Sequence, residues 1–167
     1  VTVPGALAGW DMLIRTYGKR TLAQALEPAI AYARDGFPVS PIIAAQWENE
    51  TEFLERDSAA AATYLPGGRA PKAGEWFRNP DYARSLRDIA TNGPSHLYGG
   101  PLGQRIAQHV QQLGGFLTAD DFVQHKPFWI EPISVPYKGY RLWELPPNNQ
   151  GIAALAMLRI LETYDLK

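Results

Sequence analysis

The sequence predicts a helix-rich α+β fold built from a single segment, residues 1–167. Through residues 1–127, short apolar stripes recur at helical spacing, and capping residues, prolines and glycines bound each stripe. Through residues 128–167, the period changes to two strand-like runs around a turn, followed by an apolar run. With 46% hydrophobic and 20% charged residues, the composition is that of a globular domain that can bury a core.

The first forty residues predict the end of a strand and then two helices. Residues 1–3 form the strand end, and the first helix ends at Gly18 after the apolar stripe Leu7, Trp10, Ile14 and Tyr17. Thr21 and Gln24 form a capping box for the second helix, in which Pro28 is expected to produce a kink or a split.

Further start signals divide the rest of the helical part. A cap or a glycine precedes a first-turn proline at Pro41, Pro80 and Pro101. Ser58 is expected to cap a short alanine-rich turn, and residues 75–77 indicate extended chain. The apolar residues expected on buried faces are Ile43, Trp47, Leu54, Tyr82, Leu86, Ile89, Ala90, Leu102, Ile106, Val110 and Leu113.

The last forty residues predict a β-hairpin and a core helix. The turn falls at Lys138 and Gly139, and Pro132 and Pro136 restrict the first run to an edge strand. Residues 152–164 are apolar almost all round, so a buried C-terminal helix is expected. Three tryptophans fit core positions, namely Trp10, Trp47 and Trp143.

Charge and composition exclude several classes of partner. The net charge is −1 and no basic patch is present, so we expect no nucleic-acid and no membrane partner. The longest apolar run falls short of the roughly 18 residues that a membrane span requires. Without cysteine, there is no disulfide, thiolate nucleophile or cysteine metal site. A chain that begins at Val1 is expected to be a piece of a longer protein, and a periplasmic, extracellular or cytoplasmic bacterial location is equally compatible.

Few residues of the sequence carry catalytic or metal-binding chemistry. His96, His109 and His125 are scattered without metal-ligand spacing, so no metal or other cofactor is expected. No nucleophile motif surrounds any serine, and no phosphate-binding glycine loop occurs. Asp120 and Asp121 could form a metal or acid–base site. Their place in the first turn of a short helix instead favours an interaction with the helix dipole.

The stretch E-L-P-P-N-N-Q-G, residues 144–151, concentrates hydrogen-bonding groups between a strand and a helix. Free backbone N–H groups at a helix start can bind an anion, which makes the junction a candidate ligand site. The same groups need caps, which Asn148 or Asn149 could supply. On local chemistry alone, a capped corner is favoured over a ligand site.

Three longer stretches follow one another in the order of a known family. Residues 1–40 contain a V-P-G turn, a helix ending in Y-G, the run L-E-P-A-I-A-Y-A and D-G-F-P-V-S. Residues 79–100 read N-P-D-Y-A-R-S-L-R-D-I-A-T-N-G-P-S-H-L-Y-G-G. Residues 114–166 contain G-G-F-L-T-A-D-D-F, Y-K-G-Y, P-P-N-N-Q-G and L-R-I-L-E-T-Y-D-L. In this collinear order, nearly the whole chain resembles the γ-glutamyltransferase (γ-glutamyltranspeptidase) family.

The resemblance implies an N-terminal-nucleophile hydrolase with a four-layer αββα sandwich. In that family a proenzyme cleaves itself into a large and a small subunit, and the N-terminal Thr of the small subunit attacks a γ-glutamyl amide without a metal. The chain resembles the later part of the large subunit. Its implied partner is therefore the small subunit with the rest of the proenzyme. No catalytic residue is expected in this chain, and alone it should be inactive.

One departure from the family pattern bears on the substrate. Where many members have P-P-P-S-S-G-G, this chain has P-P-N-N-Q-G, which resembles the divergent branch that includes amide and cephalosporin acylases. Asn148, Asn149 and Gln150 are then expected to help shape a pocket for a γ-glutamyl or acyl-amide substrate. A γ-glutamyltransferase-like enzyme, an acylase with a glutaryl-type acyl group and a non-catalytic helical binding module all remain open. The isolated chain is expected to self-associate through its uncovered C-terminal helix.

Overall fold

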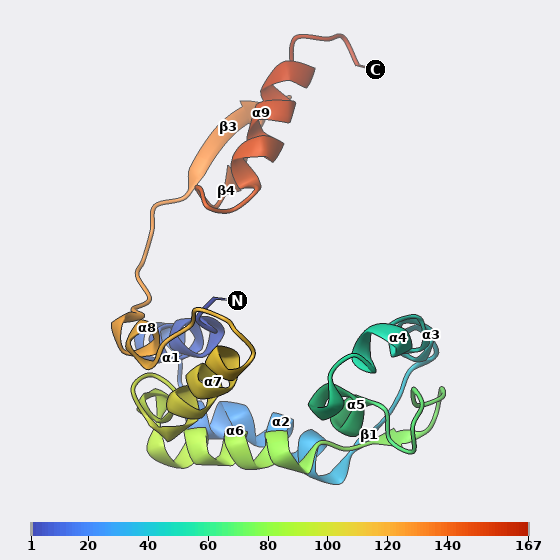
Figure 1. Cartoon of the computed structure of the whole chain (residues 1–167). Helices are drawn as coiled ribbons and strands as arrows, with labels where there is room; N and C mark the ends of the chain where they lie inside the picture. Colours follow the sequence, from blue (N-terminus) through green and yellow to red (C-terminus); the bar gives the residue numbers. More distant parts are fainter. Residues whose placement is uncertain (1, 167) are drawn as a thin grey trace. The chain divides into compact units, whose positions relative to one another are not determined.

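The computed structural model describes residues 2–166, in two compact units, Val1–Lys126 and Pro127–Lys167 (Figure 1). The first unit contains α1 (Ala6–Tyr17), α2 (Leu22–Asp35), β1 (Phe37–Pro38), α3 (Pro41–Asn49), α4 (Thr51–Leu54), α5 (Ser58–Tyr64), β2 (Trp76–Phe77), α6 (Pro80–Asn92), the 3-10 helix η1 (Pro94–His96), α7 (Pro101–Gln112) and α8 (Ala119–Gln124). The second unit contains β3 (Ile133–Tyr137), β4 (Tyr140–Glu144) and α9 (Gly151–Leu161). None of the helices in residues 2–166 is long and apolar enough to cross a membrane.

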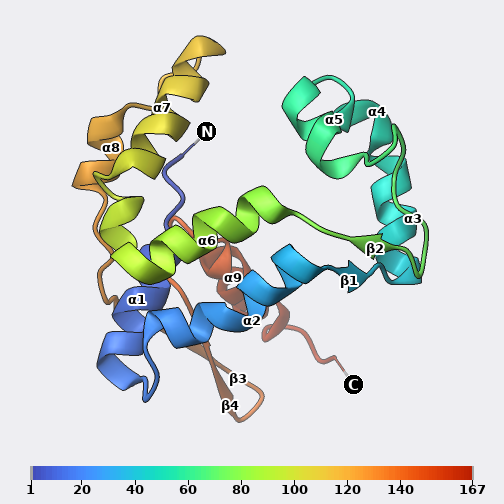
Figure 2. The same cartoon turned by 90° about the horizontal axis from the view of Figure 1, so that it is seen from below.

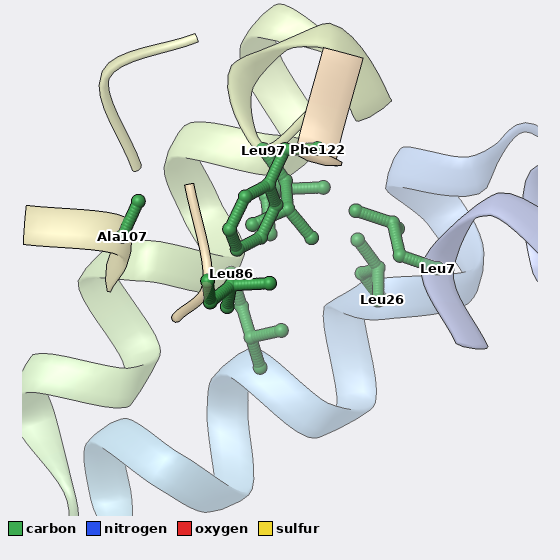
Figure 3. Close-up of a cluster of buried hydrophobic side chains, with 8 residues drawn as sticks. Leu7, Leu26, Leu86, Leu97, Ala107 and Phe122 are labelled. Atoms are coloured by element: carbon green, nitrogen blue, oxygen red, sulfur yellow. The ribbon is translucent and has the colours of Figure 1, made fainter. Parts of the chain in front are cut away.

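The core of the first unit lies where four short elements meet one end of a long helix pair. Helices α2 and α6 run side by side, and α1, η1, α7 and α8 gather at that end (Figures 1 and 2). Phe122 of α8 is 0% exposed and lies among the other buried side chains (Figure 3). These are Leu7, Leu26, Leu86, Ile89, Leu97, Ala107 and Leu117. The apolar stripes predicted for α1, α2, α6 and α7 therefore supply much of this core.

Most of the predicted helix starts are confirmed by their hydrogen bonds. The Thr21 hydroxyl accepts from Gln24 N, and the Gln24 side chain accepts from Thr21 N, which completes the capping box of α2. Ser40 caps α3, Asn79 caps α6, and Thr118 forms a second capping box with Asp121. Asp121 therefore lies in the first turn of a helix, as expected, and it also takes part in the capping box.

The predicted cap of α5 is wrong, and of the kink or split expected at Pro28 the split does not occur. The cap of α5 is Asp57, whose carboxylate accepts from Ala60 N at 2.7 Å, and Ser58 is the first residue of the helix. Helix α2 also continues without a split through Pro28. Pro28 removes one backbone hydrogen bond, but its ring is exposed and α2 packs along α6, so tertiary contact offsets the loss.

Several apolar residues expected on buried faces are exposed. They are Trp10, Ile43, Tyr82, Leu113 and Trp143. Periodicity identifies which face of a helix is apolar, but it does not say whether another element covers that face. The strand end expected in residues 1–3 is wrong for Thr2 and Val3, which form no strand, and Val1 lies outside the described residues.

A lobe formed by residues 40–75 leaves the helix pair through a short antiparallel neck. The neck pairs Phe37 with Phe77 and Pro38 with Trp76, where the chain leaves α2 and returns to α6 (Figure 2). Val39 N donates to the Glu75 carbonyl at 2.9 Å, which continues the pairing into the lobe. The sequence indicated extended chain at β2 but did not indicate β1, because two residues are too few to show strand alternation.

Tyr98 joins two segments that are ninety residues apart. Helix α1 has no side-chain cap from its N-cap residue, Gly5. The Tyr98 hydroxyl instead accepts from Ala8 N at 3.1 Å and donates to the Pro4 carbonyl at 2.6 Å. Its ring stacks on His125, with centroids 5.2 Å apart. Burial raises the pKa of the Tyr98 hydroxyl, so it remains a neutral donor and acceptor at physiological pH.

We expect Tyr98→Phe to lower the unfolding free energy of the first unit by about 1–2 kcal/mol, because Ala8 N and the Pro4 carbonyl both lose their partner. Urea unfolding followed by circular dichroism measures the change. Tyr32→Phe is the matched control, since the Tyr32 hydroxyl makes no hydrogen bond within residues 2–166. Equal stability of the two variants would contradict the capping role.

The second unit is a hairpin with one helix packed against it. Strands β3 and β4 pair antiparallel from Ile133 opposite Glu144 to Tyr137 opposite Tyr140, and α9 contacts both strands (Figure 1). Lys138 and Gly139 both have positive φ, as the predicted two-residue turn requires.

Helix α9 is only partly covered by the described chain. The sequence predicted a buried helix, but only one side of α9 is buried, through Gly151 and Leu155. The exposed apolar side chains of α9 are Ile152, Met157, Ile160 and Leu161. This uncovered apolar face agrees with the expectation that the helix lacks part of its cover.

Candidate functional site: the β4–α9 junction

The candidate site is the turn of residues 145–150 between β4 and α9. Asn149 N donates to the Pro146 carbonyl at 3.3 Å, which reverses the chain after the strand. Gln150 is the N-cap of α9, and its carbonyl accepts from Ala153 N at 2.9 Å. Pro146 is half-buried, whereas the following four residues are exposed. The turn therefore presents its polar side chains to the surroundings.

Asn148, Asn149 and Gln150 lie together on this turn, and none of their side chains caps the helix. The expectation that Asn148 or Asn149 supplies the cap is wrong, because α9 has no side-chain cap bond and Gln150 takes the N-cap position. Gln150 has a helical backbone, with φ −76° and ψ −2°, so the helical geometry already begins there. Within residues 2–166 the three side chains make no hydrogen bond, which leaves their amide groups open to a ligand.

Gly151 allows α9 to start directly against the end of β4. A Cβ atom on Gly151 would lie 2.7 Å from the Glu144 Cβ and 2.7 Å from the Leu145 carbonyl oxygen. One Glu144 carboxylate oxygen would be only 2.9 Å away. Since α9 has no acidic residue in its first turn, Glu144 brings negative charge from the strand to the positive end of the helix dipole. The sequence motif showed a glycine here but not this contact.

Other groups that could carry chemistry have structural partners or lie apart. The His96 Nε2 atom is 3.8 Å from an Asp88 carboxylate oxygen, His125 stacks on Tyr98, and His109 is exposed. Among residues 2–166, no serine or threonine hydroxyl is hydrogen-bonded to a histidine. The same residues contain no group of three or more histidines and carboxylates placed to hold a metal ion. No nucleophile with an adjacent base is thus assembled in the described chain.

A second polar feature is a cavity of about 700 Å³ in the lobe. Glu48 and Glu52 line it from α3 and α4, and a loop with Arg69 and Lys72 lines the other side. Arg69 pairs with Glu75 through two hydrogen bonds of 2.9 Å, and Lys72 N donates to the same carboxylate at 2.8 Å. These bonds to Arg69 and then to Lys72 lower the pKa of Glu75 from 4.5 to about 2.

We expect Arg69→Met to raise the pKa of Glu75 from about 2 toward 4.5, because it removes the larger cause of the shift. A lowered carboxyl pKa stabilises the folded lobe above pH 4.5, and this contribution disappears as the pH falls through about 2. Carbon NMR of the Glu75 carboxyl against pH gives both values. Arg56→Met is the control, since Arg56 makes no contact with Glu75. An unchanged midpoint in Arg69→Met would refute the role of the ion pair.

Comparison with known proteins identifies the class of the fold. The chain superposes on the crystal structure of cephalosporin acylase from Bacillus halodurans with a TM-score of 0.92 and 40% identity, over 99% of this chain and 32% of that one. The fold is therefore a helix-rich α+β part of an N-terminal-nucleophile hydrolase. The family model for gamma-glutamyltranspeptidase matches residues 1–167. The chain belongs to the gamma-glutamyltranspeptidase family.

Two curated relatives are similar over almost the whole chain. One is the glutathione hydrolase-like YwrD proenzyme of Bacillus subtilis, 42% identical over 165 residues, covering 99% of this chain and 31% of the relative. The other is the acylase ACY 1 proenzyme of Pseudomonas sp. strain SE83, 38% identical over 167 residues, covering 99% and 30%. The chain spans about a third of the length of these relatives.

Proposed function

We propose that this chain is the later part of the large subunit of a γ-glutamyltransferase-like enzyme, whose N-terminal Thr nucleophile lies outside the chain. The match of the family over residues 1–167 carries this proposal. The similarity to relatives that are named proenzymes supports a partner that arises from the same precursor.

In the proposed reaction, the Thr hydroxyl oxygen attacks the carbonyl carbon of a γ-glutamyl amide, and the α-amine of the same Thr accepts its proton. The amine leaving group departs with a proton and leaves an acyl ester on the enzyme. Water or an amino acid then attacks that ester and releases the acyl group. Asn148, Asn149 and Gln150 contribute to this chemistry by shaping the substrate pocket with their exposed amides.

An acylase with a different acyl group is the second candidate function. Two observations favour it: the P-P-N-N-Q-G junction, and the similarity to an acylase proenzyme and to the structure of a cephalosporin acylase. The substrate is then an amide whose acyl part is of the glutaryl type. The chain would serve both candidates in the same way, as a segment of the large subunit.

The test uses the longer protein encoded by the reading frame that contains this chain. We expect a Thr-initiated second subunit after self-cleavage, which N-terminal sequencing detects, and hydrolysis of a γ-glutamyl anilide or a glutaryl-cephalosporin. The better of the two substrates distinguishes the two candidates, and the 167-residue chain alone is expected to be inactive. An intact protein that never cleaves itself would favour the non-catalytic helical binding module. A reading frame without a downstream Thr-initiated subunit would end the enzyme proposal.

We also expect the isolated chain to self-associate, because α9 and the hairpin expose apolar side chains without cover. Light scattering over a concentration series measures the mass. Replacing exposed Ile160 and Met157 with glutamate should return the chain to a monomer. A monomeric wild-type chain at high concentration would contradict this expectation.

A further inference from the structure

A cavity of about 620 Å³ lies between the lobe and the α2–α6 pair, and it is open to the surroundings, since Tyr32 and Tyr82 of its lining are 61% and 53% exposed. Five aromatic side chains line it, and none of its lining side chains is charged. The aromatic residues are Tyr32, Phe37, Tyr64, Phe77 and Tyr82. They come from α2, the neck, α5 and α6, which Figure 2 shows around the base of the lobe. The lining of the cavity therefore comes from both the lobe and the α2–α6 pair, which the neck connects.

Ring contacts hold the lobe side of the cavity in place. Tyr64 stacks on Phe77 with an interplanar angle of 15° and centroids 6.3 Å apart. Trp47 lies behind them, edge-on to Phe77 at 4.7 Å and tilted against Tyr64 at 6.2 Å. Phe37 meets Phe77 edge-on at 6.0 Å. Such offset and edge-on arrangements are favourable for aromatic rings, so this wall is formed before any ligand enters.

The polar groups of the cavity are neutral. The Asn79 side chain accepts from Tyr82 N at 2.9 Å through its oxygen, which leaves its NH₂ group free of any partner among residues 2–166. The hydroxyls of Tyr32, Tyr64 and Tyr82 are likewise unpaired within that part of the chain. A ligand can thus find hydrogen-bond donors and acceptors but no compensating charge.

We propose that this cavity binds a neutral, planar aromatic molecule of one or two rings. Its volume lies within the roughly 300–1,000 Å³ of small-molecule sites, and mostly apolar walls with a few polar groups are typical of them. The lining offers no opposite charge to an ionised ligand, whereas its aromatic rings offer favourable contacts to another ring. Bound between Tyr64 of the lobe and Tyr32 of α2, the ring adds a contact between the lobe and the helix pair.

Indole titrated into protein with carbon-13-labelled alanine methyl groups tests the proposal. The Ala33 methyl lines the cavity and should shift in a saturable way. Ala29→Leu places a larger side chain on the lining and should weaken binding about tenfold or more. Ala25→Leu is the matched control, one turn earlier on α2, exposed and outside the lining, and should leave the affinity unchanged.

Three outcomes would overturn the proposal. The Ala33 methyl could fail to shift in a saturable way, either in this chain or in the longer protein, where another segment would then occupy the cavity. Ala29→Leu could bind indole as tightly as the wild type does. Indole-3-acetate, the anionic analogue, could bind as tightly as indole, which would contradict the neutral character of the site. Circular dichroism of each variant shows whether it is folded, and these binding readouts do not depend on enzyme activity.

Discussion

Replacing Phe122 with alanine is expected to lower the unfolding free energy of the first unit by about 3–5 kcal/mol. Phe122 is 0% exposed and lies at the centre of the core that joins α8 to α1, α2, α6 and α7. A Cβ on Gly103 would already come within 3.2 Å of its ring, so the surrounding chain is closely packed. Loss of the ring removes buried apolar area and leaves a cavity that this packing cannot close completely.

Urea unfolding followed by far-ultraviolet circular dichroism measures the effect, with Phe116→Ala as the control. Phe116 precedes the same short helix but is 96% exposed, so its loss should change the stability of this chain by less than about 0.5 kcal/mol. Because both variants replace a phenylalanine with alanine, their difference in stability reports the effect of burial alone. A Phe122→Ala variant as stable as Phe116→Ala would show that α8 does not anchor the core.

Gly151→Ala is expected to destabilise the second unit by about 1–3 kcal/mol, because the added methyl group has no space. Its Cβ would lie 2.7 Å from both the Glu144 Cβ and the Leu145 carbonyl oxygen, below any normal contact distance. The start of α9 must then move away from β4, and the turn with Asn148–Gln150 moves with it. Hydrogen exchange of the α9 amides should accelerate by about 5- to 160-fold.

Gly9→Ala is the control for Gly151→Ala, and it should raise the unfolding free energy instead of lowering it. Gly9 lies inside α1, and a Cβ there meets nothing within 4 Å. Alanine in such a helix interior stabilises by about 0.5–1 kcal/mol, since it restricts the unfolded chain. Unchanged exchange in Gly151→Ala would show that the strand–helix junction tolerates a side chain.

Local signals in the sequence predicted the elements whose causes are local. Thr21 and Gln24 carry their predicted capping hydrogen bonds within four residues of chain, and Asp121 lies in the first turn of a short helix, as expected. The hairpin turn at Lys138 and Gly139 is equally local. The ordered motifs also indicated the family of this chain, because each motif can be recognised in the sequence without knowledge of its tertiary contacts.

The candidate site was only partly predictable. Its position followed from the polar stretch between β4 and α9, but the cap did not, because residue preference favoured Asn148 or Asn149. The structure places Gln150 at the cap by its backbone alone and brings Glu144 to the helix start. The aromatic cavity had no sequence signal at all. Tyr32, Tyr64 and Tyr82 lie on three different helices, so only the return of the chain through the neck brings them together.

Most of the helix starts, the hairpin turn and the family of this protein could be predicted from the sequence, because these depend on neighbouring residues or on residue order. Long-range packing set which apolar faces are covered, and it left Trp143 and most of α9 exposed while burying Phe122 completely. It also decided that Tyr98 caps α1. Burial and long-range hydrogen bonds depend on which distant segment arrives at a surface. A periodic pattern of side chains does not contain that information.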